Sequence, residues 1–316
     1  MKHARLFPTL ALLAATLVMA VGLSPARAGD TVFPQGLRIG MTPLVGLAPA
    51  KTFTGFETAD ESVKVVVAEL PANAYGEVMN ALKSNPAVAS GAKPESLETT
   101  AGTAYYTVET ANDGGKTIRR YSMILPGGTF SGYVAMQVPE NASKIYSDEA
   151  VRQMFASAAV RKEVPASEFL DMMPFRTSEL ADFKTVRALT PGPSLLLADG
   201  DEATGFEAAP FMVIGLVGAP ASTEDRGRFA EQAATSIPGV HNGRLTMSEP
   251  VRIEGMAGYE TRLEATSGRN NTPVTLVQWM RFSGSSTLRI IGSAPRDQWE
   301  KAFPRFRAVR DGIQPR

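Results

Sequence analysis

Few side chains in this sequence could carry out catalysis, and histidine is the scarcest of them. The chain has two histidines and no cysteine. His3 lies in an N-terminal segment that we expect to be removed, which leaves His241 for the mature protein. A cysteine nucleophile is therefore excluded, as are zinc or copper sites that need several His and Cys ligands. We expect a surface or capping role for His241 in a turn between a helix and a strand, with a catalytic or pH-sensing role as the alternative.

The densest acidic cluster is formed by Asp199, Asp201 and Glu202, with Glu207 nearby. Calcium prefers carboxylates at such a spacing, but the segment lacks the third ligand that an EF-hand places before its glycine. We expect a turn between two strands, and weak calcium binding is the alternative. A carboxylate-based hydrolase is a further alternative, although nothing in the sequence brings two acids to the ~5–9 Å separation of a glycosidase.

Three aromatic residues, Tyr106, Tyr259 and Trp279, fall on predicted strands. Aromatic rings bind apolar or sugar faces well, so these side chains could line a ligand groove. Packing within the sheet is the preferred interpretation. The candidates retained for ligand or partner contact are Asp199, Asp201, Glu202, His241 and Trp279.

No known catalytic motif appears in the chain. It contains no Gly-x-Ser-x-Gly elbow, and its glycine-rich segments match neither a P-loop nor a dinucleotide-binding pattern. We therefore predict no catalytic residue, no cofactor and no metal ligand, and we expect the protein not to be an enzyme.

Residues 1–28 have the pattern of a signal peptide: basic residues, an apolar run over 10–23, and small residues at the end. We expect cleavage between Ala28 and Gly29 and a periplasmic or secreted protein. No later apolar run approaches the ~20 residues of a membrane span. Removal of the segment leaves 29 basic and 32 acidic residues, so we expect no nucleic-acid partner and no membrane span.

The remaining chain is long enough for two cores, and it repeats itself. Residues 102–139 resemble residues 255–295, each a meander of three antiparallel strands with turns rich in Gly, Asn and Asp. We place a first domain at 29–162 and a second at 163–316. Proline in the intervening segment prevents the first closing helix from continuing.

A helix precedes each meander, and a longer helix follows it. In the first half, Tyr75, Val78, Met79 and Leu82 have helical spacing and predict a stripe that faces the core. Ser147 is the predicted N-cap of the closing helix in that half. In the second half, Pro304 either starts the second piece of the closing helix or kinks a continuous one.

The two halves differ most at their beginnings. The second opens with a predicted short helix over 167–172 and a hairpin over 183–198, whereas residues 37–56 of the first are irregular and rich in Gly and Pro. We therefore expect the hairpin to be an addition that the first half lacks.

The order of elements resembles that of the PsbP-like, Mog-like α/β/α sandwich. The resemblance rests on the Gly-x-x-x-Tyr openings at 102–106 and 255–259, on Tyr121 and Trp279 in the second meander strand, and on Phe306 in the closing helix. It covers about residues 37–159 and 183–312. It implies an α+β fold of two tandem sandwich domains, each a mainly antiparallel sheet flanked by helices, and it implies no catalytic residue.

Besides the carboxylate-based hydrolase, two functions remain open. The preferred one is a non-enzymatic binding or assembly module of the bacterial envelope with a protein partner. The alternative is a periplasmic carrier of a small apolar or amphiphilic ligand, held between sheet and helices or between the domains.

Overall fold

The computed structural model describes residues 29–84, 94–189, 193–201 and 205–316. Two seven-stranded sheets, one in each half, account for most of the chain, and every strand pairing within them is antiparallel. The predicted α+β class and the two tandem domains are confirmed. The proposed signal peptide, including Ala28, lies outside the described residues, and the boundary at 162/163 stays a prediction.

The first domain consists of one large sheet, a short two-stranded ribbon and helices. Its elements are β1 (Ile39–Gly40), β2 (Leu47–Pro49), β3 (Gly55–Thr58), β4 (Lys64–Leu70), α1 (Ala74–Ser84), β5 (Glu95–Thr99), β6 (Gly102–Asp113), β7 (Lys116–Pro126), β8 (Ser131–Pro139), the 3-10 turn η1 (Glu140–Ala142), α2 (Asp148–Ala156) and β9 (Ala159–Val160).

The second domain follows after α3 (Ala166–Asp171). Its elements are β10 (Phe175–Thr177), β11 (Thr185–Leu189), β12 (Ser194–Ala198), η2 (Phe206–Ala208), β13 (Phe211–Gly218), α4 (Arg226–Thr235), β14 (Val240–Ile253), β15 (Met256–Ser267), β16 (Thr272–Ser283), β17 (Ser286–Pro295), η3 (Arg296–Gln298), α5 (Trp299–Asp311) and β18 (Ile313–Pro315).

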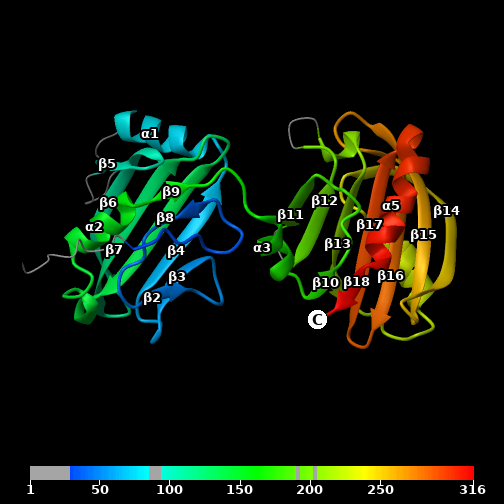
Figure 1. The fold of residues 1–316 in the computed structure, drawn as a ribbon, viewed down its shortest axis with the longest axis horizontal. Coiled ribbons are helices and arrows are strands. Elements are labelled where there is room, and N and C mark those ends of the chain that lie inside the picture. The colour runs from blue at the N-terminus through cyan, green and yellow to red at the C-terminus, as the bar shows by residue number, and fades with distance from the viewer. Residues whose placement is uncertain (1–28, 85–93, 190–192, 202–204) are drawn as a thin grey trace, which may run out of the picture.

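The two domains have the same topology from their first strand to their last. The strand order is β2-β3-β4-β8-β7-β6-β5 in the first sheet and β11-β12-β13-β17-β16-β15-β14 in the second. Each domain also closes with a ribbon, β1 with β9 and β10 with β18, that joins its opening segment to its last residues. The β11-β12 hairpin is therefore not an addition, because β2 and β3 are its counterparts (Figure 1).

Short, irregular strands hid this equivalence in the sequence. β2 and β3 have only three and four residues and contain Pro and Gly, so their alternation of buried and exposed positions is too brief to recognise. The edge strands β5 and β14 were missed for another reason. Most of their side chains are exposed, and β14 has register shifts, so neither shows a clear apolar face.

One face of each sheet is covered by its closing helix. In the first domain, Val151, Met154 and Phe155 of α2 are buried against the sheet, and Ser147 caps the helix as predicted. In the second domain, Phe306 and Val309 of α5 are buried. A Cβ at Gly292 would lie 2.7 Å from the Phe306 ring, so glycine in β17 allows the close approach of this helix. α5 runs through Pro304 without interruption.

The other face of each sheet is covered by the helix that precedes the meander. Ala230 and Ala234 of α4 are fully buried in the second domain. α1 occupies the corresponding position in the first domain, and it packs less closely. Among helices in the described segments, none has the length and apolar content needed to cross a membrane.

The tyrosines of the two Gly-x-x-x-Tyr openings lie on opposite faces. Tyr106 packs edge-on against Phe155, on the α2 side of its sheet. Tyr259 packs with Ala230, on the α4 side of the other sheet. The shared spacing in the sequence thus does not mean a shared environment, whereas Tyr121 and Trp279 both lie under their closing helices.

Glu168 of α3 joins the two domains. Its carboxylate accepts hydrogen bonds from both terminal nitrogens of Arg161, each at 2.6 Å, and from the Gly36 amide at 3.0 Å. The neighbouring Phe169 and Leu170 pack against the core of the second domain. One turn of helix is therefore bonded to the first domain and packed into the second (Figure 1).

This contact should depend on pH. Hydrogen bonds from Arg161 hold the pKa of Glu168 below its usual range, against the opposing effect of burial. Because the unfolded value is about 4.3, the contact contributes fully above that pH and is lost as the pH falls through the folded-state pKa. We expect Glu168→Gln to lower the unfolding free energy by ~1 kcal/mol at pH 7 and by almost nothing near pH 3. Chemical denaturation at both pH values measures this, and Glu163→Gln, an exposed neighbour, is the control. Equal losses at both pH values would contradict it.

Candidate functional site

The acidic segment singled out in the sequence serves the packing of the second domain. Asp199 forms a two-point ion pair with Arg305 of α5, at 2.6 and 3.0 Å. The pair joins the end of β12 to the closing helix. Asp201 lies two residues further on, and Glu202 lies outside the described residues. Within the described ranges, no three His, Cys, Asp or Glu side chains are placed to hold a metal ion.

Trp279 and His241 differ in burial. Trp279 is fully buried, and its Nε1 donates a 2.8 Å hydrogen bond to Glu260. Phe303 and Arg310 of α5 lie against its ring. It belongs to the core, so a partner cannot reach it in this conformation. His241 is exposed, as expected, but it lies on the edge strand β14, opposite Thr266, and not in the predicted turn.

The corresponding aromatic residue of the first domain is also held by a carboxylate. The Tyr121 hydroxyl donates to Asp148 at 2.7 Å, and Arg119 forms an ion pair with the same carboxylate. Burial, followed by the hydrogen bond to Asp148, raises the pKa of Tyr121 to about 12, so the hydroxyl stays protonated. This group fixes the start of α2.

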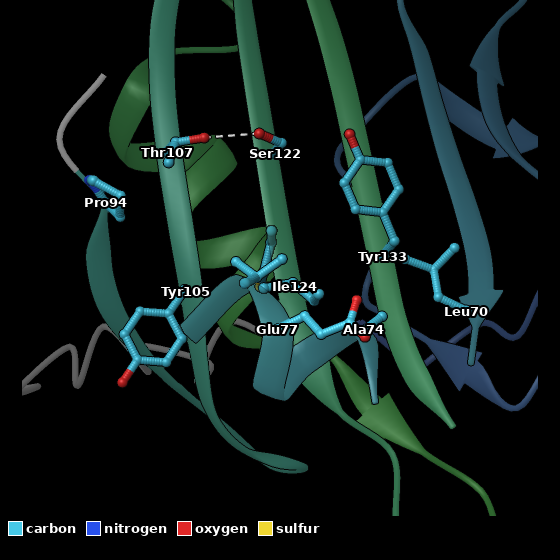
Figure 2. A pocket seen from close by; sticks show the side chains of 11 residues that line it. Leu70, Ala74, Glu77, Pro94, Tyr105, Thr107, Ser122, Ile124 and Tyr133 are labelled. Atoms are coloured by element: carbon cyan, nitrogen blue, oxygen red, sulfur yellow. Dashed lines mark hydrogen bonds between the residues drawn. The ribbon is translucent and has the colours of Figure 1, made fainter. Parts of the chain in front are cut away.

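A cavity lies on the opposite face of the first sheet, beneath α1. Its volume is about 300 Å³, at the lower end of the range for small-molecule sites. Figure 2 shows side chains from α1, β6, β7 and β8 arranged around it. The residues that line it are mostly apolar or aromatic: Leu70, Ala74, Glu77, Val78, Pro94, Tyr105, Thr107, Ser122, Met123, Ile124 and Tyr133.

The second domain shows why this space is empty. Tyr121 and Trp279 occupy equivalent positions of the two sheets. The next residue on each strand is Ser122 in the first domain and Met280 in the second. The cross-strand neighbours of Ser122 are Thr107 and Ala135, and those of Met280 are Tyr259 and Arg289. Three large side chains in one domain thus correspond to three small ones in the other. Because these three side chains are small, they leave space between the sheet and α1.

The helices above the two rows are held differently. In the second domain, Gln278 donates to the Ala230 carbonyl at 2.8 Å and Arg289 to the Ala233 carbonyl at 2.5 Å. Sheet side chains therefore hold the middle and end of α4. α1 is held near its N-terminus, where the fully buried Ser131 accepts from the Tyr75 amide and donates to the Ala72 carbonyl.

The predicted apolar stripe of α1 is only partly buried. Tyr75 and Met79 are half-buried, Val78 is 37% exposed, and the Leu82 side chain is not described. The expectation that this stripe packs into the core was wrong in that respect. The cavity separates α1 from the sheet, so Val78 lines the cavity instead of filling it.

Hydroxyl groups supply most of the polar atoms in the cavity. Thr107 and Ser122 share one hydrogen bond of 2.7 Å, drawn in Figure 2, which leaves one of their two hydroxyl protons to donate elsewhere. Tyr105 and Tyr133 contribute aromatic walls. The site has the composition of a binding pocket for an apolar molecule with one polar end. Sequence patterns missed it, although a residue-by-residue comparison of the two meanders would have revealed the row of small residues.

The chain matches no protein-family model, and comparison with curated proteins gives no match. Solved structures similar to parts of it include LpqN of Mycobacterium tuberculosis, described as involved in cell envelope biogenesis. That match has 14% identity over 45% of this chain and 83% of LpqN, with a TM-score of 0.34.

Two further similar structures differ in the share of the chain that they match. Cyanobacterial PsbP from Synechocystis sp. PCC 6803 has 14% identity over 45% of this chain and 82% of its own, with a TM-score of 0.31. The T6SS immunity protein TplEi of Pseudomonas aeruginosa has 8% identity over 90% of this chain and 96% of its own, at 0.24. A PsbP-like protein is thus among the structures that this fold is similar to, as the order of elements implied. With TM-scores below 0.5, none of them supports an argument about function.

The attachment of α1 can be tested at Ser131. We expect Ser131→Ala to lower the unfolding free energy by ~1–3 kcal/mol, because an amide and a carbonyl at the start of α1 lose their partner. Hydrogen exchange in α1 should accelerate as well. Ser143→Ala, which removes an exposed hydroxyl contact to Glu140, is the control and should cost below ~0.5 kcal/mol. Unchanged exchange in α1 would show that Ser131 does not hold the helix.

Proposed function

We propose that the protein is an exported, non-enzymatic binding protein and that the cavity beneath α1 holds a small apolar or amphiphilic ligand. One observation carries the proposal: the two domains share a topology, yet Thr107, Ser122 and Ala135 stand where the other domain has a filled face. The second domain fills the corresponding face with Tyr259, Met280 and Arg289, whereas the space beneath α1 is open to solvent at Val78.

The apolar lining supports binding rather than catalysis. Among the described residues, the cavity is lined by one carboxylate, Glu77, and by no histidine or basic side chain. General acid-base chemistry usually needs a second titrating group beside the first. Asp199 of the acidic segment is engaged by Arg305 and is therefore a poor candidate for a catalytic acid.

A protein partner in the envelope stays a prediction. Exposed apolar side chains in the described segments, such as Val45 and Ile145, are common on protein surfaces and do not by themselves identify a docking site. The cavity therefore favours the carrier function over the assembly function.

Filling the cavity tests the proposal. Ser122→Met introduces the residue found at the corresponding position of the second domain. We expect it to weaken binding of the uncharged dye N-phenyl-1-naphthylamine by at least ~tenfold, measured by fluorescence titration. Native mass spectrometry of freshly purified protein should find a retained small molecule in the parent and none in the variant.

The control for this test lies on the same strand. Thr117→Met adds a methionine at an exposed position of β7 outside the cavity and should leave dye binding unchanged. Equal affinity of the parent and Ser122→Met would remove the cavity as the binding site.

Export can be tested on the full chain. We expect expression in a Gram-negative host to give a periplasmic protein that begins at Gly29, because the residues before it have the small-x-small cleavage pattern. Intact mass and N-terminal sequencing measure this. Ala28→Asp should block processing and serve as the control. A cytoplasmic product that keeps residues 1–28 would contradict the prediction.

A further inference from the structure

The cavity beneath α1 has an uneven charge distribution. Glu77 lies in its lining, and the structure gives this carboxylate one side-chain partner, the Asn73 amide nitrogen, at 2.5 Å. Among the basic side chains that the structure describes, none forms an ion pair with it. Its charge is therefore available to a ligand.

Two basic side chains on the same face of the sheet, Arg120 and Lys64, have acidic partners. Arg120, two residues before Ser122, pairs with Glu109 at 3.1 Å across β6 and β7. Lys64 of β4 pairs with Glu61 at 3.3 Å. Neither is in the lining of the cavity. An anionic ligand would thus find no basic side chain among the described residues that line the cavity.

A second carboxylate adds to the negative potential near α1. Glu98 accepts a hydrogen bond from Thr103, and no described base pairs with it. Tyr75, in the first turn of α1, is close enough to Glu98 for the carboxylate charge to affect the Tyr75 hydroxyl. Burial raises the pKa of the Tyr75 hydroxyl, and the nearby Tyr105 and Glu98 raise it further.

The interior of the cavity differs from its charged surroundings. Leu70, Ile124 and the aromatic walls exclude charge, and the Thr107–Ser122 pair offers one neutral donor. A ligand that satisfies all of these groups has an apolar body and a positively charged end. A charged amine beside an exposed carboxylate such as Glu77 gains a modest Coulomb energy that salt screens.

We infer that the ligand is a cationic amphiphile, with its apolar body in the cavity and a protonated amine beside Glu77. The inference rests on the proposed function and adds the chemical class of the ligand. Glu77 is then the residue that determines specificity. A neutral analogue binds through its apolar body alone, and a carboxylate analogue is repelled.

Three probes with the same alkyl chain and different head groups separate the contribution of the apolar body from that of the head-group charge. Octylamine, octanol and octanoate, each below its micelle-forming concentration, compete with N-phenyl-1-naphthylamine at pH 7 and low ionic strength. We expect octylamine to bind most tightly and octanoate most weakly, with ~fivefold or more between them. Added salt should reduce this ratio.

Glu77→Gln keeps the size of the side chain and its contact with Asn73, and it removes the charge. The variant should bind all three probes within ~twofold of one another and bind octanol as the parent does. Glu140→Gln, an exposed acid outside the cavity, is the matched control and should keep the preference for the amine.

The outcomes separate the two proposals. If no probe displaces the dye, or if Ser122→Met binds the probes as the parent does, the cavity is not a binding site and the proposed function fails. If octanol binds and Ser122→Met prevents it, but octanoate equals or exceeds octylamine, the cavity binds ligands and the inference about the head group is overturned. Retention of the amine preference in Glu77→Gln would overturn the role of that residue.

Discussion

The packing of a closing helix against one face of an antiparallel sheet is the interaction on which each domain depends. With no cysteine for disulfides, burial of apolar surface must supply the stability. Phe155 and Phe306 are fully buried at these contacts. The ribbons β1-β9 and β10-β18 then tie the residues after each helix to the opening of the same domain. Strand order follows from this closure and is identical in both copies.

Because one face is fixed, the other face can vary without loss of the fold. In the second domain, Gln278 and Arg289 bind carbonyl groups of α4, and the face is filled. In the first domain, smaller residues leave space and α1 is held near its beginning by Ser131. The sheet face beneath α4 is therefore filled, whereas the sheet face beneath α1 has space.

Several carboxylates that could have served chemistry are instead used to hold elements together. Asp199 joins β12 to α5, Asp148 joins α2 to Tyr121, and Glu168 joins the two domains through Arg161. A carboxylate paired with arginine is stabilised in its charged form and is a poor proton donor near neutral pH. Glu77 differs because the structure gives it an amide partner and no basic one.

The sequence by itself determined the elements that have a strong hydrophobic periodicity or a clear signal at the end of a helix or strand. Helical spacing located α2 and α5, Ser147 marked a helix start, and turns rich in Gly and Asn delimited the meanders. These features depend on neighbours within one or two turns, so they can be read locally. β2 and β3 are too short to show an alternation of buried and exposed residues, and most side chains of β5 and β14 are exposed. These four strands could be recognised only from their pairing within the sheet.

Only the tertiary structure decided which face each strand residue occupies and therefore where a cavity forms. Tyr106 and Tyr259 share a spacing but lie on opposite faces, because a shift of one residue in a strand reverses every side chain. Thr107 and Ser122 are 15 residues apart in sequence, and cross-strand pairing brings their hydroxyls within 2.7 Å. The cavity beneath α1 depends on that register and on the distance of the helix from the sheet, and neither quantity is encoded in any short segment of the chain.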